Sequence, residues 1–220
     1  GHPISEEVAI EMDRESFAFF YKLAAEKEWL GLFPGSRDSE IRKMLPLYLK
    51  AAKSWTDKEI LVSKAHSVNH QLFMDIISEY NLPNLHIIDG YTYEMMKYCE
   101  ALVCTSGTAT LEAAYIGTPA VICYRANPIS YIIGRYFVRI SHIGLPNIIL
   151  NDKVLPELVQ NELNPEGINR ELKKLMSGSP QREEILKKLY KLRAMLSDKK
   201  PSREVPLIIE KLLKIHGKTT

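Results

Sequence analysis

The chain has 220 residues, a length that suits one α/β unit with additional helices and excludes a large two-domain enzyme. Hydrophobic residues make up 45% of it and charged residues 25%, so it is a folded globular protein rather than a disordered or fibrous one. Its formal charge is +2, which gives no global excess of positive charge for a nucleic-acid backbone.

The N-terminal segment 1–28 predicts an amphipathic helix. Between residues 6 and 28, apolar side chains such as Val8, Met12 and Phe17 recur close to every 3.6 positions. The opening residues do not resemble a secretory signal, and no stretch approaches the roughly 18 apolar residues of a membrane-spanning helix. We therefore expect the chain to be cytosolic or, at most, peripheral to a membrane.

In the segment 29–163 the hydrophobic pattern changes to alternating strands and helices. Short apolar runs are bounded by turn-forming or polar residues, and the longer segments between them have helical spacing. This alternation predicts a Rossmann-like, doubly wound α/β domain, in which a parallel sheet has helices on both faces. The expected strands are residues 29–33, 59–62, 86–88, 101–104 and 120–123.

The cysteine and histidine spacings indicate neither a disulfide framework nor a metal site. Cys104 and Cys123 lie inside expected strands, and Cys99 adds no CxxC spacing, which suggests buried thiols in a reducing cytoplasm. His66 and His70 could share one face of a helix, but they have neither the glutamate of an HExxH motif nor an evident third ligand.

The C-terminal segment 164–220 predicts three basic helices, at residues 165–176, 181–196 and 202–215. Gly-Ser-Pro and Lys-Lys-Pro sequences separate them, and Lys and Arg outnumber Asp and Glu in this part of the chain. The basic surface is either a solvated helical face or a surface that meets anionic lipid or a partner subunit. These helices are expected to pack on the α/β domain or on a partner lobe.

The turn at residues 33–40, FPGSRDSE, leaves the first expected strand and enters a helix, so it lies at the carboxyl edge of the sheet. Gly35 permits a tight turn, Ser36 and the helix start offer amides, and Arg37 adds a guanidinium fork suited to phosphate oxygens. We interpret this turn as an anion cradle, although it is neither a Walker loop nor a GxGxxG motif. The alternative is an ordinary capped helix start, with Glu40 closing a capping box.

A second turn, at residues 104–112 with the sequence CTSGTATLE, also runs from a strand into a helix. Ser106, Gly107 and Thr108 stand where a diphosphate would need backbone amides and hydroxyl groups. Glu112 lies about one turn inside the helix, where it could accept hydrogen bonds from a ribose diol. The alternatives are that Ser106 caps the helix and that Glu112 is a surface carboxylate. A nucleophilic serine is disfavoured because the GxSxG elbow is absent.

Taken together, these motifs resemble the motif series of the lipid A disaccharide synthase family, in order and in spacing. The series comprises residues 33–37 with Glu40, 106–112, 124–125, 145–149 and 156–160. The opening Gly-His-Pro also resembles the sequence at that family's interdomain crossover. The resemblance covers essentially the whole chain, but the family's own chains are close to twice as long. The residues present resemble the C-terminal half, which binds the donor nucleotide.

The resemblance implies one lobe of a GT-B glycosyltransferase. The reaction that the resemblance implies is the transfer of 2,3-diacylglucosamine from UDP to 2,3-diacylglucosamine 1-phosphate with inversion. Its product is the lipid A disaccharide of lipopolysaccharide. The acceptor pocket and the proposed general base belong to the half without a counterpart here, so we name no catalytic base and expect this chain alone to bind UDP without activity. The alternatives are another GT-B enzyme, such as a UDP-N-acetylglucosamine epimerase or a cell-wall glycosyltransferase, and a non-catalytic nucleotide-binding module.

The same resemblance implies roles for individual residues. Arg37 would stabilise the UDP leaving group, Glu112 would hold the ribose, and the Asp89-Gly90 turn would pair with uracil. The residues assigned to UDP are Gly35, Ser36, Arg37, Gly90, Ser106, Gly107, Thr108 and Glu112. Those assigned to the donor sugar or the cleft are Glu40, Arg125, Asn147, Glu157 and Gln160. The alternative for Asn147 is a simple loop turn.

The resemblance also implies partners and a location. The donor would be UDP-2,3-diacylglucosamine and the lipid acceptor would be held by the missing half, with no metal, cofactor or nucleic acid required. Two chains could form a homodimer by exchanging C-terminal helices, on the cytoplasmic face of the inner membrane. The segment 128–142, which interleaves arginines with aliphatic and aromatic residues, is either a helix packed on the core or a patch that meets the bilayer.

Overall fold

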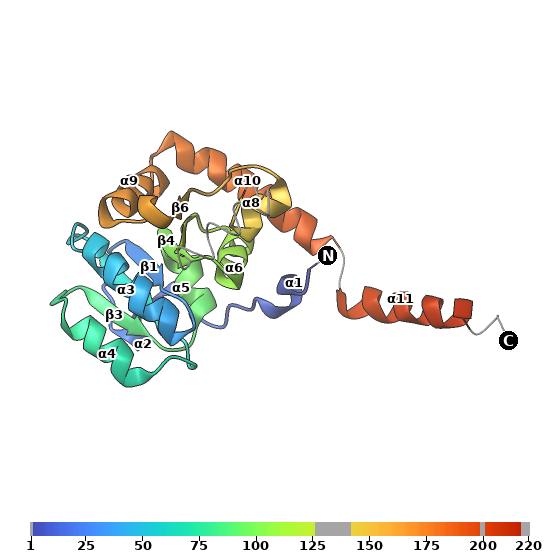
Figure 1. Ribbon diagram of the computed structural model, residues 1–220, viewed down its shortest axis with the longest axis horizontal. Coiled ribbons are helices and arrows are strands. Elements are labelled where there is room, and N and C mark those ends of the chain that lie inside the picture. Colours follow the sequence, from blue (N-terminus) through green and yellow to red (C-terminus); the bar gives the residue numbers. More distant parts are fainter. Residues whose placement is uncertain (1, 126–141, 199–200, 217–220) are drawn as a thin grey trace.

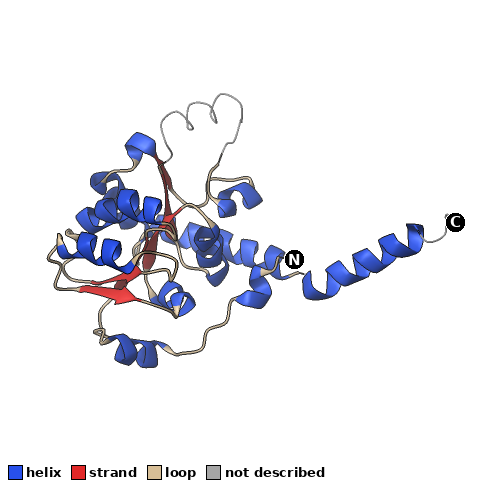
Figure 2. Ribbon diagram, turned by 60° about the horizontal axis from the view of Figure 1, so that its bottom comes forward, coloured by secondary structure: helices blue, strands red, loops and turns tan. Residues whose placement is uncertain are grey.

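The computed structural model describes residues 2–125, 142–198 and 201–216, which contain a sheet of six parallel strands (Figures 1 and 2). The strand order is β3-β2-β1-β4-β5-β6, the order of a Rossmann sheet. The fold class predicted from the sequence is therefore confirmed. The strands are β1 Trp29–Phe33, β2 Glu59–Ser63, β3 Leu85–Ile88, β4 Ala101–Thr105, β5 Ala120–Tyr124 and β6 Glu157–Val159.

Helices cover both faces of this sheet (Figure 2). Alternate strand residues point to opposite faces, so that Leu30 and Leu32 pack in one hydrophobic cluster, while Trp29 and Phe33 pack in the other. The first cluster is completed by α3 (Asp38–Ala52), α4 (His70–Ser78) and α9 (Pro165–Leu175). The second is completed mainly by α2 (Arg14–Tyr21), α5 (Thr92–Tyr98), α6 (Thr108–Ile116) and α10 (Pro180–Ser197).

The strand order reverses direction between β1 and β4. The chain leaves β1 toward β2 on one side, whereas it leaves β4 toward β5 on the other. The two connections therefore diverge and open a crevice at the carboxyl ends of these neighbouring strands, which is where open α/β sheets bind ligands. Both motifs singled out in the sequence, at residues 33–40 and 104–112, begin at this crevice.

The single N-terminal helix predicted for residues 6–28 is wrong. The structure has a short helix α1 (Ile4–Glu7), an extended segment, and then α2. The buried Glu94 side chain accepts hydrogen bonds from the N–H groups of Glu11 (2.6 Å) and Met12 (3.3 Å), which replaces the helical pairing of these amides. Asp13 then caps α2 by accepting from the Ser16 N–H, a local signal that the hydrophobic periodicity obscured.

The C-terminal part contains the three expected helices, α9, α10 and α11 (Pro201–His216). In both views α11 projects from the body of the protein (Figures 1 and 2). Three elements were not predicted from the sequence: the helix α8 (Leu145–Leu150), the short strand β6 and the 3-10 turn at Gln160–Glu162. The three residues of β6 begin with a glutamate, so they do not form an apolar run of the kind that marked the other strands.

Among the described residues, no helix is long and apolar enough to cross a membrane. The segment 128–142, which we expected to pack on the core or to meet a bilayer, lies outside the described residues except for its final position.

Candidate nucleotide-binding site

The turn that follows β1 folds tightly against its own glutamate. Gly35 has a φ of +115°, a backbone conformation that residues other than glycine rarely adopt. A Cβ at this position would also lie 2.3 Å from Glu40 Oε2. The Ser36 N–H donates to Glu40 Oε2 over 2.9 Å, and Arg37 Nη1 donates to Glu40 Oε1 over 3.2 Å. In this structure the donors of the expected anion cradle are therefore bonded to a carboxylate of the same chain, that of Glu40.

Residues of the loop between β2 and α4 hold this turn from the other side. The Ser67 hydroxyl donates to the Ser36 carbonyl over 2.7 Å, and the Asn69 N–H donates to Asp38 Oδ1 over 2.9 Å. The N-cap of α3 is Arg37, whose side chain makes no capping hydrogen bond. The turn is thus positioned by contacts that leave the guanidinium at the crevice.

The turn that follows β4 is tied to the end of β5. The Ser106 N–H donates to the Cys123 carbonyl over 2.8 Å, and the Ser106 hydroxyl lies 3.4 Å from the carbonyl oxygen of Ile143. No described heavy atom lies within 4 Å of a Cβ built on Gly107, so the backbone there is open to close approach. Because α6 begins at Thr108, its first amides are available at the same edge.

Glu112 lies one turn inside α6 and is half-buried. Burial raises the pKa of its carboxyl above the ordinary value, and the negative charge of Glu7 raises it further. Burial likewise raises the pKa of Tyr93, with further contributions from Glu112 and Glu7. Among the described residues no cation offsets these two effects, so the carboxylate would gain from hydrogen-bond donors supplied by a ligand.

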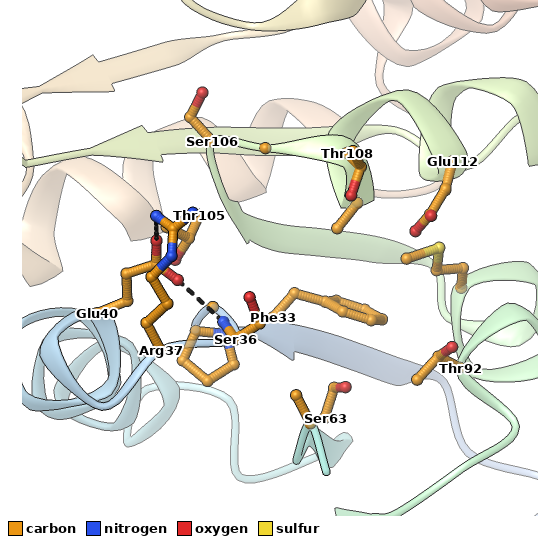
Figure 3. A pocket seen from close by; sticks show the side chains of 16 residues that line it. Phe33, Ser36, Arg37, Glu40, Ser63, Thr92, Thr105, Ser106, Thr108 and Glu112 are labelled. Atoms are coloured by element: carbon orange, nitrogen blue, oxygen red, sulfur yellow. Dashed lines mark hydrogen bonds and ion pairs between the residues drawn. The ribbon is translucent and has the colours of Figure 1, made fainter. Parts of the chain in front are cut away.

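The two turns meet in one cavity of about 400 Å³ (Figure 3). Arg37 and Glu40 lie at one end of it, Glu112 and Thr92 lie at the other, and Ser106 and Thr108 lie on the β4 side. Cavities of this size suit a small ligand. Eight of the residues singled out from the sequence line it: Gly35, Ser36, Arg37, Glu40, Ser106, Gly107, Thr108 and Glu112.

The expected uracil turn lies beside this cavity rather than in its lining. Gly90 has a φ of +91° and Tyr91 a φ of +46°, so that two consecutive residues adopt the left-handed conformation. The Tyr21 hydroxyl of α2 donates to the Asp89 carbonyl over 3.0 Å and lies 3.5 Å from the Gly90 carbonyl. Thr92, which follows directly, lines the cavity.

Arg125 and Gln160 lie outside the lining as well. Arg125 follows β5, and its Nη2 donates to the Gln160 carbonyl over 3.3 Å and to the Leu163 carbonyl over 2.9 Å. These hydrogen bonds fasten the 3-10 turn after β6 to the end of β5. Arg125 thus contacts backbone of its own chain rather than the cavity.

Asn147 and Glu157 are also absent from the lining, and their contacts are internal. The Asn147 side chain is fully buried and bonded to the backbone of Val154 and Leu155. The Glu157 carboxylate accepts from the N–H groups of Ile143 (3.1 Å) and Gly144 (2.9 Å). The structure therefore places both residues in an internal network outside the cavity lining, and a direct contact with a donor sugar stays a prediction.

Several lining residues were not singled out from the sequence, notably Ser63, Thr92 and Met96. Ser63 ends β2, and Thr92 lies shortly after β3. The rule that ligands bind at the carboxyl ends of strands could have identified both, because it applies to every strand of the sheet. Met96 comes from the interior of α5, for which the sequence holds no comparable signal.

In the part of the chain that the structure describes, no group of three His, Cys, Asp or Glu side chains is arranged to hold a metal ion. His66 Nδ1 instead lies 3.3 Å from Asp89 Oδ1, and Lys64 Nζ lies 3.3 Å from Asp89 Oδ2. Both contacts attach the turn after β3 to the end of β2. His70 begins α4.

The sequence model of the lipid-A-disaccharide synthetases matches residues 1–208. Curated relatives include the lipid-A-disaccharide synthase of Syntrophus aciditrophicus, 34% identical over 200 residues, which cover 89% of this chain and 52% of the relative. The lipid-A-disaccharide synthase of Nitrosococcus oceani is 36% identical over 200 residues, with coverages of 89% and 51%. The chain therefore spans about half the length of these relatives.

Solved structures share the fold at low sequence identity. The spinosyn forosaminyltransferase SpnP superposes with a TM-score of 0.58 at 13% identity, covering 89% of this chain and 46% of that one. WaaG, a glycosyltransferase involved in lipopolysaccharide biosynthesis, gives a TM-score of 0.54 at 16% identity, with coverages of 85% and 47%. In both, the fold of this chain corresponds to about one half of a glycosyltransferase.

Proposed function

The chain belongs to the lipid-A-disaccharide synthetase family, and we propose that it is the nucleotide-sugar-binding half of an inverting GT-B glycosyltransferase. In this proposal the complete enzyme transfers 2,3-diacylglucosamine from UDP to 2,3-diacylglucosamine 1-phosphate. The product is the lipid A disaccharide of lipopolysaccharide. The curated relatives bear the name of this activity, and the chain covers about half of their length.

One observation carries the proposal: the turns after β1 and β4 line a single cavity at the point where the strand order reverses. One turn supplies a guanidinium and a backbone amide, and the other supplies hydroxyl groups and the start of a helix. Two such turns can bind both phosphates of one diphosphate between them. Arg37 and Glu112 lie at opposite ends of the cavity, so a ligand that contacts both must extend along it (Figure 3).

In the proposed arrangement the diphosphate lies against Gly35, Ser36 and Arg37 and against the turn at 106–108, and Glu112 accepts hydrogen bonds from the ribose. The base would then lie near Thr92 and the turn at Asp89-Gly90. The sugar would extend toward Glu40, Arg125, Asn147, Glu157 and Gln160.

Arg37 performs the chemistry that this half contributes. As the bond between the anomeric carbon and the diphosphate oxygen breaks, negative charge grows on UDP, and a guanidinium stabilises that charge more strongly than it stabilises the bound donor. The proposal requires no metal for this step. In this proposal the acceptor hydroxyl is activated by the other half of the enzyme, which the 220 residues do not include.

The proposal includes an assembly and a location. The acceptor lipid would be held by the other half, and the enzyme would work at the cytoplasmic face of the inner membrane. The C-terminal helix α11, which projects from the body, could pack against a second chain and so exchange between subunits (Figure 1). No nucleic-acid partner is proposed, in keeping with the formal charge of +2.

Calorimetry on the 220-residue chain tests the proposal. UDP should bind, and UMP should bind more weakly because it lacks the second phosphate. Equal affinities for the two would contradict the diphosphate contacts. Glycosyl transfer should be undetectable with this chain alone and should appear when the remaining half is supplied. Binding of UDP without transfer by the completed protein would favour a non-catalytic nucleotide-binding module.

A further inference from the structure

Glu40 occupies two of the donors that the proposed function gives to the diphosphate, the Ser36 N–H and an N–H of Arg37 Nη1. One carboxylate oxygen lies 2.9 Å from the Ser36 nitrogen and the other lies 3.2 Å from Arg37 Nη1. The carboxylate also lies so close to Gly35 that a Cβ there would overlap with it. While this contact persists, the arginine and the glutamate neutralise each other, and the cradle has no net positive charge.

Contacts other than those of Glu40 also hold the turn in place. The Ser36 carbonyl is held by the Ser67 hydroxyl, and the Asp38 carboxylate is held by the Asn69 N–H. These contacts use atoms other than the two donors that face the cavity. Removing the charge of Glu40 should therefore leave the frame of the turn intact and change what its donors can bind.

We propose that the Glu40 carboxylate is an internal competitor that must leave the Ser36 amide and the Arg37 guanidinium before a diphosphate can bind there. The inference rests on the proposed function, because it concerns the same diphosphate. A carboxylate and a phosphate have the same sign of charge and cannot share the two donors without strong repulsion. The Arg37 side chain is 78% exposed, so its pair with Glu40 is weak enough to exchange.

The competition would weaken the binding of UDP. Affinity for a site that is partly closed by its own side chain is reduced by the fraction of time for which the site is open. When UDP leaves, the carboxylate returns to the same donors and opposes rebinding. Glu40 would thus act on how much of the site is occupied by UDP, rather than by contacting the reacting atoms.

The variant Glu40→Gln tests the proposal, because glutamine keeps an acceptor for the Ser36 N–H but lacks the charge. Asp38→Asn is the matched control: it removes one charge from the same helical turn and keeps the acceptor for Asn69. We expect Glu40→Gln to strengthen UDP binding about three- to tenfold by calorimetry, which corresponds to breaking an exposed ion pair. UMP, which lacks the second phosphate, should change less than about twofold, and Asp38→Asn should change neither affinity by more than that.

Three results would overturn the proposal. Unchanged or weaker UDP binding by Glu40→Gln, with an unaltered unfolding midpoint, would make Glu40 a positioning residue for Arg37. If Asp38→Asn strengthens UDP binding equally, or if Glu40→Gln strengthens UMP binding equally, the effect is a general electrostatic one. It would then come from removing any negative charge at the start of α3. Wild-type protein that binds no UDP would refute the proposed function and this inference with it.

Discussion

The side-chain amide of Asn147 donates a hydrogen bond of 2.8 Å to Glu157 Oε1. The same amide donates to the Leu155 carbonyl, and the Asn147 carbonyl oxygen accepts from the N–H groups of Val154 and Leu155. Glu157 in turn accepts from the Gly144 N–H. The pair therefore joins the start of α8 to β6 and to the segment that precedes β6.

Asn147→Asp should destabilise the protein strongly. The change places a carboxylate where the amide donates to Glu157 and to a backbone carbonyl, in a site with no exposure to solvent. We expect a loss of about 2 to 4 kcal/mol in the free energy of unfolding, measured by urea denaturation. Asn161→Asp, at an exposed position, is the control and should change stability by no more than about 0.5 kcal/mol. Equal stability of the two variants would show that the network contributes little.

The sheet could be predicted from the sequence because four of its strands, β1, β2, β4 and β5, are apolar runs buried on both faces. β1, β2 and β4 consist almost wholly of buried residues, so local composition reports their tertiary position directly. The N-terminal segment shows the limit of this reasoning. Its periodicity was helical, but Glu94, more than eighty positions away, takes the amides of residues 11 and 12.

The cavity was predictable to a similar degree. The two turns were found because glycine, hydroxyl and arginine residues follow strands directly, and the switch point brings those strands together. The contact between Glu40 and the cradle could not be found in this way. A capping box predicts a glutamate that returns to the helix start, but not that it takes the Ser36 amide and the Arg37 guanidinium together.

Arg37→Ala should weaken UDP binding without altering the fold. The substitution removes a charge-assisted interaction of about 1.5 to 3 kcal/mol, or roughly ten- to a hundredfold in affinity. Arg42→Ala, on the exposed surface of the same helix and outside the cavity lining, is the matched control and should leave UDP affinity unchanged. If both variants bind UDP like the wild type, Arg37 is a surface residue and the diphosphate lies elsewhere.

Glu112→Gln should weaken UDP binding, because a neutral amide accepts hydrogen bonds from ribose hydroxyls less strongly than a carboxylate does. We expect a loss of roughly tenfold or more, measured by calorimetry at pH 7. Because the pKa of Glu112 is raised by burial and by Glu7, wild-type affinity should also fall as the pH is lowered toward that pKa. An affinity for UDP that is insensitive to this substitution would remove Glu112 from the site.

The same variant should be more stable than the wild type at pH 7. With a raised pKa, folded Glu112 holds its proton more tightly than the unfolded chain does, so the ionised group disfavours the folded state above that pKa. As the pH falls through the raised pKa, the carboxyl becomes protonated and this disadvantage disappears. Thermal unfolding should therefore show a higher Tm for Glu112→Gln at neutral pH and a smaller difference at acidic pH. A lower Tm at pH 7 would indicate that the carboxylate has stabilising partners.

Tyr21→Phe should weaken the binding of the nucleoside rather than that of the diphosphate. The hydroxyl that is lost donates to the Asp89 carbonyl and lies 3.5 Å from the Gly90 carbonyl. Because these peptides are trans, the N–H groups of Gly90 and Tyr91 point away from the Tyr21 hydroxyl. Release of this turn should reduce UDP affinity about three- to tenfold, since one ordinary hydrogen bond is lost, and should leave pyrophosphate affinity unchanged. Tyr190→Phe, at an exposed position of α10, is the control. Equal weakening of UDP and pyrophosphate would show a general loosening of the cavity instead of a role for Tyr21 in positioning the turn beside the base.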